Sequence, residues 1–211
     1  MIRDFFRWLG ILSAYPAQLI FFKRKTFYED KRAQSLRIKG GALIISNHFN
    51  AFDFVMNLFA VLPRKLYIVC SEHPYRNPFL AWGMGFWGGI QADRTTKSLR
   101  FIDESVEVLE RGGLVQIFPE GRNTDNGEVG EFRLTYLMIA NRAGVPIVPI
   151  VTDGRYGLFK RAHILVGKAI DLKALCPSER PTREELATAN EIIHGRIVEM
   201  KIELERLTAK K

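Results

Sequence analysis

The chain has 211 residues, of which 47% are hydrophobic and 26% are charged. This balance excludes wholesale disorder and fits one compact domain with a sizeable core. The formal net charge of +8 favours an anionic partner: a phosphorylated ligand, an anionic membrane surface or nucleic acid. The two cysteines, Cys70 and Cys176, have no metal-ligand spacing and form no disulfide framework, so a reducing, cytosolic setting is expected.

Residues 1–30 are predicted to form an apolar helical segment that associates with a membrane. The uncharged stretch Trp8–Phe22 is about 15 residues long, whereas a spanning helix needs about 20, and no small-residue cleavage site follows it. We expect a helix, continuous or broken at Pro16, that lies in one leaflet at the cytoplasmic face of the cell membrane as a peripheral or monotopic element. Residues 23–25, all basic, would meet anionic head groups. The alternative is that this helix packs on the domain's own core.

Short apolar runs alternate with helical patterns through residues 31–211. Strands are expected over residues 42–45, 65–70, 88–94, 114–118, 145–151 and 164–170. Helices are expected over residues 52–62, 77–86, 95–111, 132–142 and 182–207. This order predicts an α/β domain with a mostly parallel central sheet flanked by helices. Two prolines in the run 145–151 favour an edge position or a special backbone path for that strand.

The turn after the first of these strands carries His48 and Asp53, five residues apart. A carboxylate beside a histidine fixes its tautomer and stabilises the imidazolium, which suits a general base. The alternative is that Asn50 caps the following helix, Asp53 supports the helix N-terminus and His48 is a polar turn residue. This stretch alone slightly favours the second interpretation.

Other polar residues also follow expected strands: Arg94, Glu120 and Arg122. In open α/β sheets, ligands bind beyond the carboxyl ends of the strands. We therefore expect these side chains and His48 on one rim of the sheet. Such an arrangement is hard to attribute to helix capping alone.

Four segments in this order resemble the motifs of the glycerolipid acyltransferases. Asn47-His48 with Asp53 resembles the NHxxxxD motif, and residues 88–94 resemble the second motif, a strand that contains Gly and ends in Asp-Arg. Residues 118–121, Phe-Pro-Glu-Gly, match the third motif, and residues 145–150 resemble the fourth, an apolar strand with a proline. The chain is therefore identified as a member of this family, and it resembles the lysophosphatidic acid (1-acylglycerol-3-phosphate) acyltransferases most.

The resemblance implies transfer of a fatty acyl group from an acyl thioester, acyl-CoA or acyl carrier protein, to the hydroxyl of lysophosphatidate. It implies no metal and no cofactor besides the acyl donor, and the bilayer as a partner. By this resemblance, His48 is the general base, Asp53 orients it and Arg94 holds the acceptor phosphate. The further substrate-binding residues implied are Asn47, Glu120, Gly121 and Arg122, with Glu120 fixing either the acceptor or the motif's own loop. The family commonly has Thr-Arg after the third motif, whereas here Arg122 follows Gly121 directly.

Other functions stay open at this point. The acceptor could be glycerol-3-phosphate or another lysolipid. A hydrolase of acyl thioesters or phospholipids is a weaker alternative, because the chain has no G-x-S-x-G nucleophile elbow. A basic nucleic-acid-binding module is not expected, since no recognition motif is present. The isolated His73, His163 and His194 are expected to have structural or surface roles.

Overall fold

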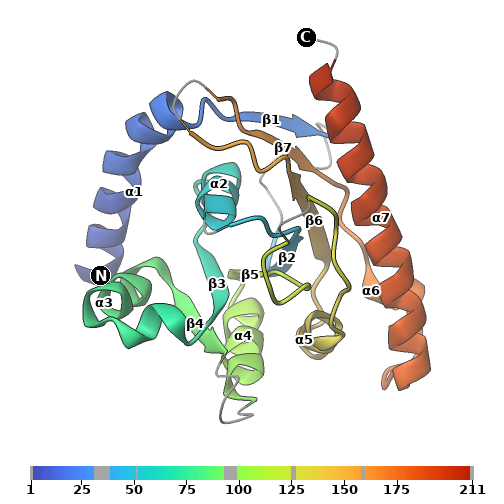
Figure 1. The fold of residues 1–211 in the computed structure, drawn as a ribbon. Coiled ribbons are helices and arrows are strands. Elements are labelled where there is room, and N and C mark those ends of the chain that lie inside the picture. The colour runs from blue at the N-terminus through green and yellow to red at the C-terminus, as the bar shows by residue number, and fades with distance from the viewer. Residues whose placement is uncertain are drawn as a thin grey trace.

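The computed structural model describes residues 2–30, 39–50, 52–92, 99–124, 127–157 and 160–209. Within this part, one seven-stranded sheet has the order β1-β7-β6-β2-β5-β3-β4 (Figure 1). The strands are β1 Lys25–Tyr28, β2 Ala42–Ser46, β3 Leu66–Ser71, β4 Gly89–Ala92, β5 Leu114–Ile117, β6 Ile147–Thr152 and β7 His163–Val166. Among these strands, β6 and β7 pair antiparallel and the other neighbours pair parallel. The predicted mostly parallel sheet is confirmed.

Helices cover both faces of the sheet. They are α1 Ile2–Phe21, α2 Phe52–Ala60, α3 Pro78–Trp87, α4 Arg100–Glu110, α5 Thr135–Ala143, α6 Leu172–Leu175 and α7 Arg183–Ala209, with a 3₁₀ turn, η1, over His73–Arg76. In Figure 1, α1 and α7 lie on opposite sides of the molecule, and α3 lies beside the start of α1. The first helix is continuous through Pro16, so the expected alternative of a break there is wrong.

Alternate residues of the strands pack into two separate cores. In β2, Leu43 and Ile45 belong to the core beneath α4, α5 and α7, whereas Ala42 and Ile44 belong to the core beneath α1 and α2. All four side chains are fully buried. Burial on both faces explains why the strand is one continuous apolar run and not an alternating pattern.

Two strands differ from the sequence-based expectations. β6 lies inside the sheet between β7 and β2, so its predicted edge position is wrong. β7 pairs with β6 from Ile150 onward, so Pro149 lies where this ladder is interrupted and its missing N–H removes no strand hydrogen bond.

β1 was not anticipated: it places part of the predicted membrane segment in the sheet, paired with β7. The proposed boundary between residues 30 and 31 stays a prediction.

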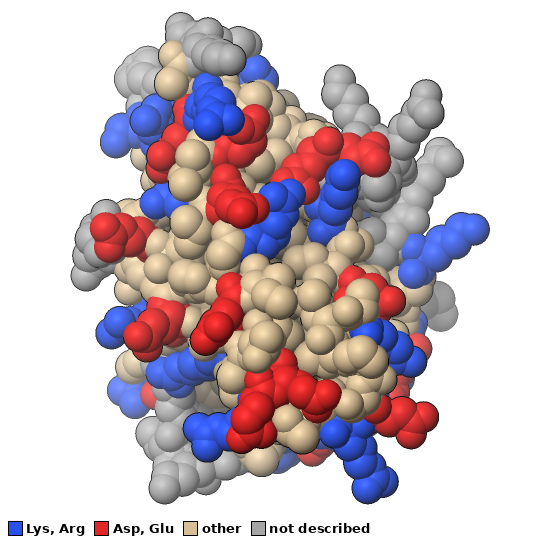
Figure 2. Space-filling view, turned by 90° about the vertical axis from the view of Figure 1, so that its right-hand side faces the viewer, with Lys and Arg blue, Asp and Glu red and all other residues tan. Residues whose placement is uncertain are grey.

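The charges on the α7 side of the molecule are mixed. Figure 2 shows acidic and basic side chains interspersed over this face. Arg196 pairs with Glu199 and Arg206 with Glu203, each at 3.1 Å. The buried face of α7 is formed by Ala189, Ile193, Ile197, Met200 and Leu204. α7 is thus an amphipathic helix that packs on the domain through this face, and the excess positive charge does not gather here into a basic patch.

Two glycine substitutions test the packing of the sheet against its helices. A Cβ on Gly41 would lie 2.1 Å from the backbone oxygen of Leu109 in α4, so we expect Gly41→Ala to lower the free energy of unfolding by about 1–3 kcal/mol. Gly195 in α7 faces open space, and Gly195→Ala should raise the same free energy by about 0.5–1 kcal/mol through helix propensity. Urea unfolding followed by circular dichroism measures both. Stabilisation by Gly41→Ala would contradict this packing.

Candidate active site

One carboxylate closes the turn between β2 and α2. Asp53 is fully buried, and its Oδ2 lies 3.0 Å from His48 Nδ1. The same oxygen accepts the backbone N–H groups of Phe49 at 2.6 Å and Asn50 at 2.8 Å. The Asn50 side chain in turn accepts the N–H of Phe52 at 2.8 Å. Capping and pairing therefore coexist, and the expected hydrogen-bond reach between His48 and Asp53 is confirmed.

This geometry assigns the histidine a tautomer. Asp53 accepts hydrogen bonds, so Nδ1 of His48 carries the proton and Nε2 keeps a free lone pair. The imidazole stacks on Phe118 with ring centroids 3.8 Å apart and an interplanar angle of 12°. The ring is thus held on one edge by a carboxylate and on one face by an aromatic side chain.

Glu120 holds this turn to the neighbouring loop. Its Oε1 accepts the backbone N–H of His48 and its Oε2 accepts that of Gly130, each at 3.1 Å. The side chain is 4% exposed. Burial raises the pKa of Glu120, while the two backbone N–H groups and His48 act in the opposite direction. Both carboxylate oxygens thus serve the backbone around His48, and a contact with substrate stays a prediction.

Asn47 joins the ends of two strands. Its Nδ2 donates to the carbonyl of Thr152, and its Oδ1 accepts the N–H of Thr152, each at 3.0 Å. The side chain is buried. These contacts fix the carboxyl ends of β2 and β6 side by side. The predicted role of Asn47 in substrate binding stays a prediction.

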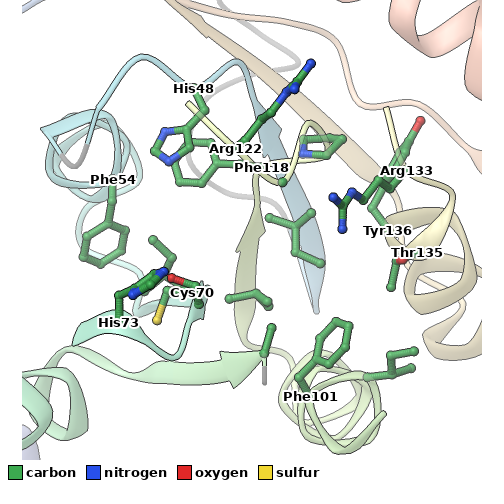
Figure 3. A pocket seen from close by; sticks show the side chains of 18 of the residues that line it. His48, Phe54, Cys70, His73, Phe101, Phe118, Arg122, Arg133, Thr135 and Tyr136 are labelled. Atoms are coloured by element: carbon green, nitrogen blue, oxygen red, sulfur yellow. The ribbon is translucent and has the colours of Figure 1, made fainter. Parts of the chain in front are cut away.

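A cavity of about 940 Å³ opens beside His48, within the size range of small-molecule sites. Its apolar lining includes Phe54, Val69, Met84, Phe101, Ile102, Ile117 and Phe118. In Figure 3, His48 and Phe118 lie across the cavity from Cys70 and Phe101. Burial raises the pKa of the Cys70 thiol to about 11, so it is protonated at neutral pH and is a poor nucleophile.

Two arginines line the same cavity. Arg122 lies in the loop after β5, on the rim where the sequence predicted it, and it is exposed. Arg133, just before α5, was not anticipated, and in Figure 3 its side chain points back toward the cavity. Gly121 has φ +66°, and a Cβ there would lie 3.1 Å from Arg133 Nε, so glycine leaves room for this arginine. Arg94 lies outside the described residues, and its phosphate-binding role stays a prediction.

One contact of the site and one histidine–carboxylate pair outside it escaped the sequence analysis. The hydroxyl of Tyr156, 103 residues from Asp53, donates to Asp53 Oδ1. A second histidine–carboxylate pair joins His163 Nδ1 to Asp153 Oδ2 at 2.6 Å, although His163 seemed isolated in the sequence. No local spacing could reveal either contact, because the antiparallel return from β6 to β7 creates them.

The chain matches the family model described as Acyltransferase over residues 24–153. It is 30% identical over 124 residues to a 1-acyl-sn-glycerol-3-phosphate acyltransferase of Pseudomonas aeruginosa, covering 54% of this chain and 45% of that protein. A chloroplastic 1-acyl-sn-glycerol-3-phosphate acyltransferase of Arabidopsis thaliana is 26% identical over 115 residues, covering 54% of this chain and 32% of that protein. The chain thus spans a third to a half of these relatives' length.

The fold also matches a solved structure. The crystal structure of the 1-acyl-sn-glycerophosphate acyltransferase PlsC from Thermotoga maritima superposes with a TM-score of 0.63. The match covers 90% of this chain and 78% of that chain at 20% identity. It confirms the α/β architecture with its central sheet and flanking helices.

Glu120→Gln tests how far the buried carboxylate organises the site. Glutamine keeps one acceptor oxygen and turns an NH₂ group toward a backbone N–H, so either His48 or Gly130 loses its acceptor. We expect faster hydrogen exchange at these two amides and a free energy of unfolding lower by about 1–3 kcal/mol. The exposed neighbour Glu131 provides the control, and Glu131→Gln should change neither. Unchanged exchange at both amides in Glu120→Gln would refute the contact.

Proposed function

The chain belongs to the Acyltransferase family, and we propose that it moves a fatty acyl group from an acyl thioester to the hydroxyl of lysophosphatidate, giving phosphatidate. The observation that carries this proposal is the 3.0 Å pair of His48 and Asp53 beside a largely apolar cavity that two arginines also line. Relatives named as 1-acyl-sn-glycerol-3-phosphate acyltransferases support this choice of acceptor.

In the proposed reaction, His48 Nε2 takes the proton of the acceptor hydroxyl as the oxygen attacks the thioester carbonyl. A C–O bond forms, the tetrahedral intermediate collapses, the C–S bond breaks and the leaving thiolate takes the proton back from the imidazolium. Asp53 stabilises that imidazolium, as a carboxylate does in a serine-hydrolase triad. The substrate supplies the hydroxyl, so the enzyme forms no covalent acyl intermediate.

The cavity lining suggests where each part of the substrates lies. Apolar side chains such as Phe54 and Phe101 would contact the fatty acyl chain. Arg122 and Arg133 would attract the acceptor phosphate, together with Arg94 by family resemblance. The donor is acyl-CoA or an acylated acyl carrier protein, and no cofactor is proposed besides it.

The outer face of α1 suits a membrane surface. Phe5, Leu12 and Ile20 are each more than 60% exposed, and such apolar exposure marks interaction sites. The opposite face packs on the domain through the buried Ile11 and through Arg7, which donates to the Leu66 carbonyl. The inner face thus makes the core contact, and we propose the outer face as the membrane contact.

The neighbouring α3 extends this apolar surface. Its Phe79 and Trp82 are 75% and 64% exposed, and Gly10 of α1 lies against Trp87 of α3. None of the helices in the described ranges is long and apolar enough to cross a membrane. We propose peripheral or monotopic attachment to the cytoplasmic face through this two-helix surface.

The two histidine–carboxylate pairs allow a matched test of the catalytic role. His48→Gln should lower the acyl-transfer rate by about a hundredfold to ten-thousandfold, the usual contribution of a general base. His163→Gln, in the pair with Asp153, should retain transfer. The assay uses acyl-CoA and acyl carrier protein as donors, with lysophosphatidate, glycerol-3-phosphate and other lysolipids as acceptors. Circular dichroism verifies folding.

Two outcomes would contradict the proposal. Folded His48→Gln protein that retains the transfer rate would exclude His48 as the base. Wild-type protein that transfers acyl groups faster to glycerol-3-phosphate than to lysophosphatidate would keep the chemistry and reject the acceptor.

A pair of identical substitutions tests the membrane surface. Ile20 in α1 and Ile202 in α7 are 61% and 53% exposed, and Ile→Glu at either site changes charge equally. Ile20→Glu should weaken partition to vesicles of phosphatidylcholine and phosphatidylglycerol by about tenfold or more, since one apolar side chain contributes about 1.5–3 kcal/mol. Ile202→Glu should leave partition unchanged. Equal loss in both variants would place the contact elsewhere.

A further inference from the structure

The carboxylate of Asp53 is held from both sides. Three donors reach its Oδ2: the His48 ring and the N–H groups of Phe49 and Asn50. Its Oδ1 receives the hydroxyl of Tyr156. The first three donors come from the same turn, whereas Tyr156 comes from the loop after β6. The orientation of this carboxylate therefore depends on a residue that none of the acyltransferase motifs contains.

The hydrogen bonds beyond Asp53 have one direction. Since the Tyr156 hydroxyl donates to Asp53, its oxygen accepts from the Thr152 hydroxyl at 2.7 Å. Thr152 Oγ1 in turn accepts the Gly154 N–H at 3.3 Å. A donor that itself accepts a hydrogen bond is a stronger donor. The series of hydrogen bonds thus runs from the Gly154 N–H through the Thr152 and Tyr156 hydroxyls to Asp53.

Packing leaves Tyr156 little freedom to turn away. Its ring contacts Phe22 edge-on, with centroids 5.8 Å apart, and Phe52 at 6.0 Å. Burial and the charge of Asp53 raise the pKa of the Tyr156 hydroxyl far above its usual range, so it stays protonated and donates. The backbone of Thr152, at the root of the loop, is held by Asn47.

We propose that Tyr156 is a positioning residue for the catalytic pair, because its hydroxyl fixes Asp53 Oδ1 so that Oδ2 faces the His48 ring. This inference rests on the proposed acyl transfer for its kinetic consequence, but the geometry is independent of the substrate. Without the hydroxyl, the carboxylate gains a rotational freedom and loses a donor that shares its charge. The rate of transfer then falls because the carboxylate is less well oriented. The imidazolium form of His48 is favoured over a wider pH range because the carboxylate charge is no longer shared with the Tyr156 hydroxyl.

Other charged groups near the pair stay constant in the test. They are Glu120 after β5, Arg122 in the same loop and Asp153 after β6. None of them changes when Tyr156 loses its hydroxyl. A shift in the pH dependence of the variant therefore reports the Tyr156–Asp53 contact.

The experiment compares Tyr156→Phe with Tyr28→Phe. Tyr28 in β1 packs against the same core as Tyr156 and makes no part of the site, so each variant removes one hydroxyl from a comparable setting. We expect Tyr156→Phe to lower kcat about tenfold to a hundredfold with little change in KM, as for misplaced catalytic groups. The acid limb of its kcat–pH profile should move upward by about half a unit. Tyr28→Phe should match the wild-type profile.

A readout without turnover separates this inference from the proposed function. The pH midpoint of the His48 ring resonances in NMR, assigned with His48→Gln, should move upward in Tyr156→Phe whether or not the protein transfers acyl groups. Thr152→Val should give a smaller shift in the same direction and add nothing in the double variant with Tyr156→Phe. Wild-type midpoints in both Tyr156→Phe and Thr152→Val would overturn the inference. If the two shifts of the His48 midpoint add in the double variant, Thr152 does not act through Tyr156, and the proposed series of hydrogen bonds from Thr152 to Asp53 is wrong.

Discussion

The site depends on the carboxylate of Asp53. A buried charge needs several hydrogen bonds to be tolerated, and here donors from the turn after β2 and from the loop after β6 supply them. The same carboxylate holds the N-terminus of α2 close to the end of β2. The carboxylate that accepts the backbone N–H groups of the turn also orients the imidazole of His48, so a correctly folded turn already holds His48 in place.

The order of strands brings the remaining parts together. β2 lies between β5 and β6 in the sheet, so the residues that follow these three strands share one rim. Glu120 after β5 holds the backbone of His48 from one side, and Thr152 at the end of β6 is joined to Asn47 on the other. Motif residues far apart in sequence thus support the same histidine, mostly through its backbone and its carboxylate partner.

The resemblance to the acyltransferase motifs favoured the His48–Asp53 contact, which the turn alone left second to helix capping, whereas local patterns predicted the alternation of strands and helices. They could do so because strand burial, helix periodicity and turn length act over a few residues. The interior position of β6, the edge strand β1 and the contacts of Tyr156, Arg133 and His163 escaped prediction. Each depends on pairing or packing between distant segments, and the antiparallel return into β7 has no local signature.

The most direct test of the claim that Asp53 orients His48 as a general base is to measure which ring nitrogen of His48 carries the proton. ¹⁵N NMR of the imidazole, assigned by comparison with a His48 variant, distinguishes the two ring nitrogens. If Asp53 orients a general base, then in the neutral form Nδ1 carries the proton and Nε2 does not. A neutral ring with its proton on Nε2, or a spectrum unchanged by Asp53→Asn, would contradict the assignment of this pair as the catalytic centre.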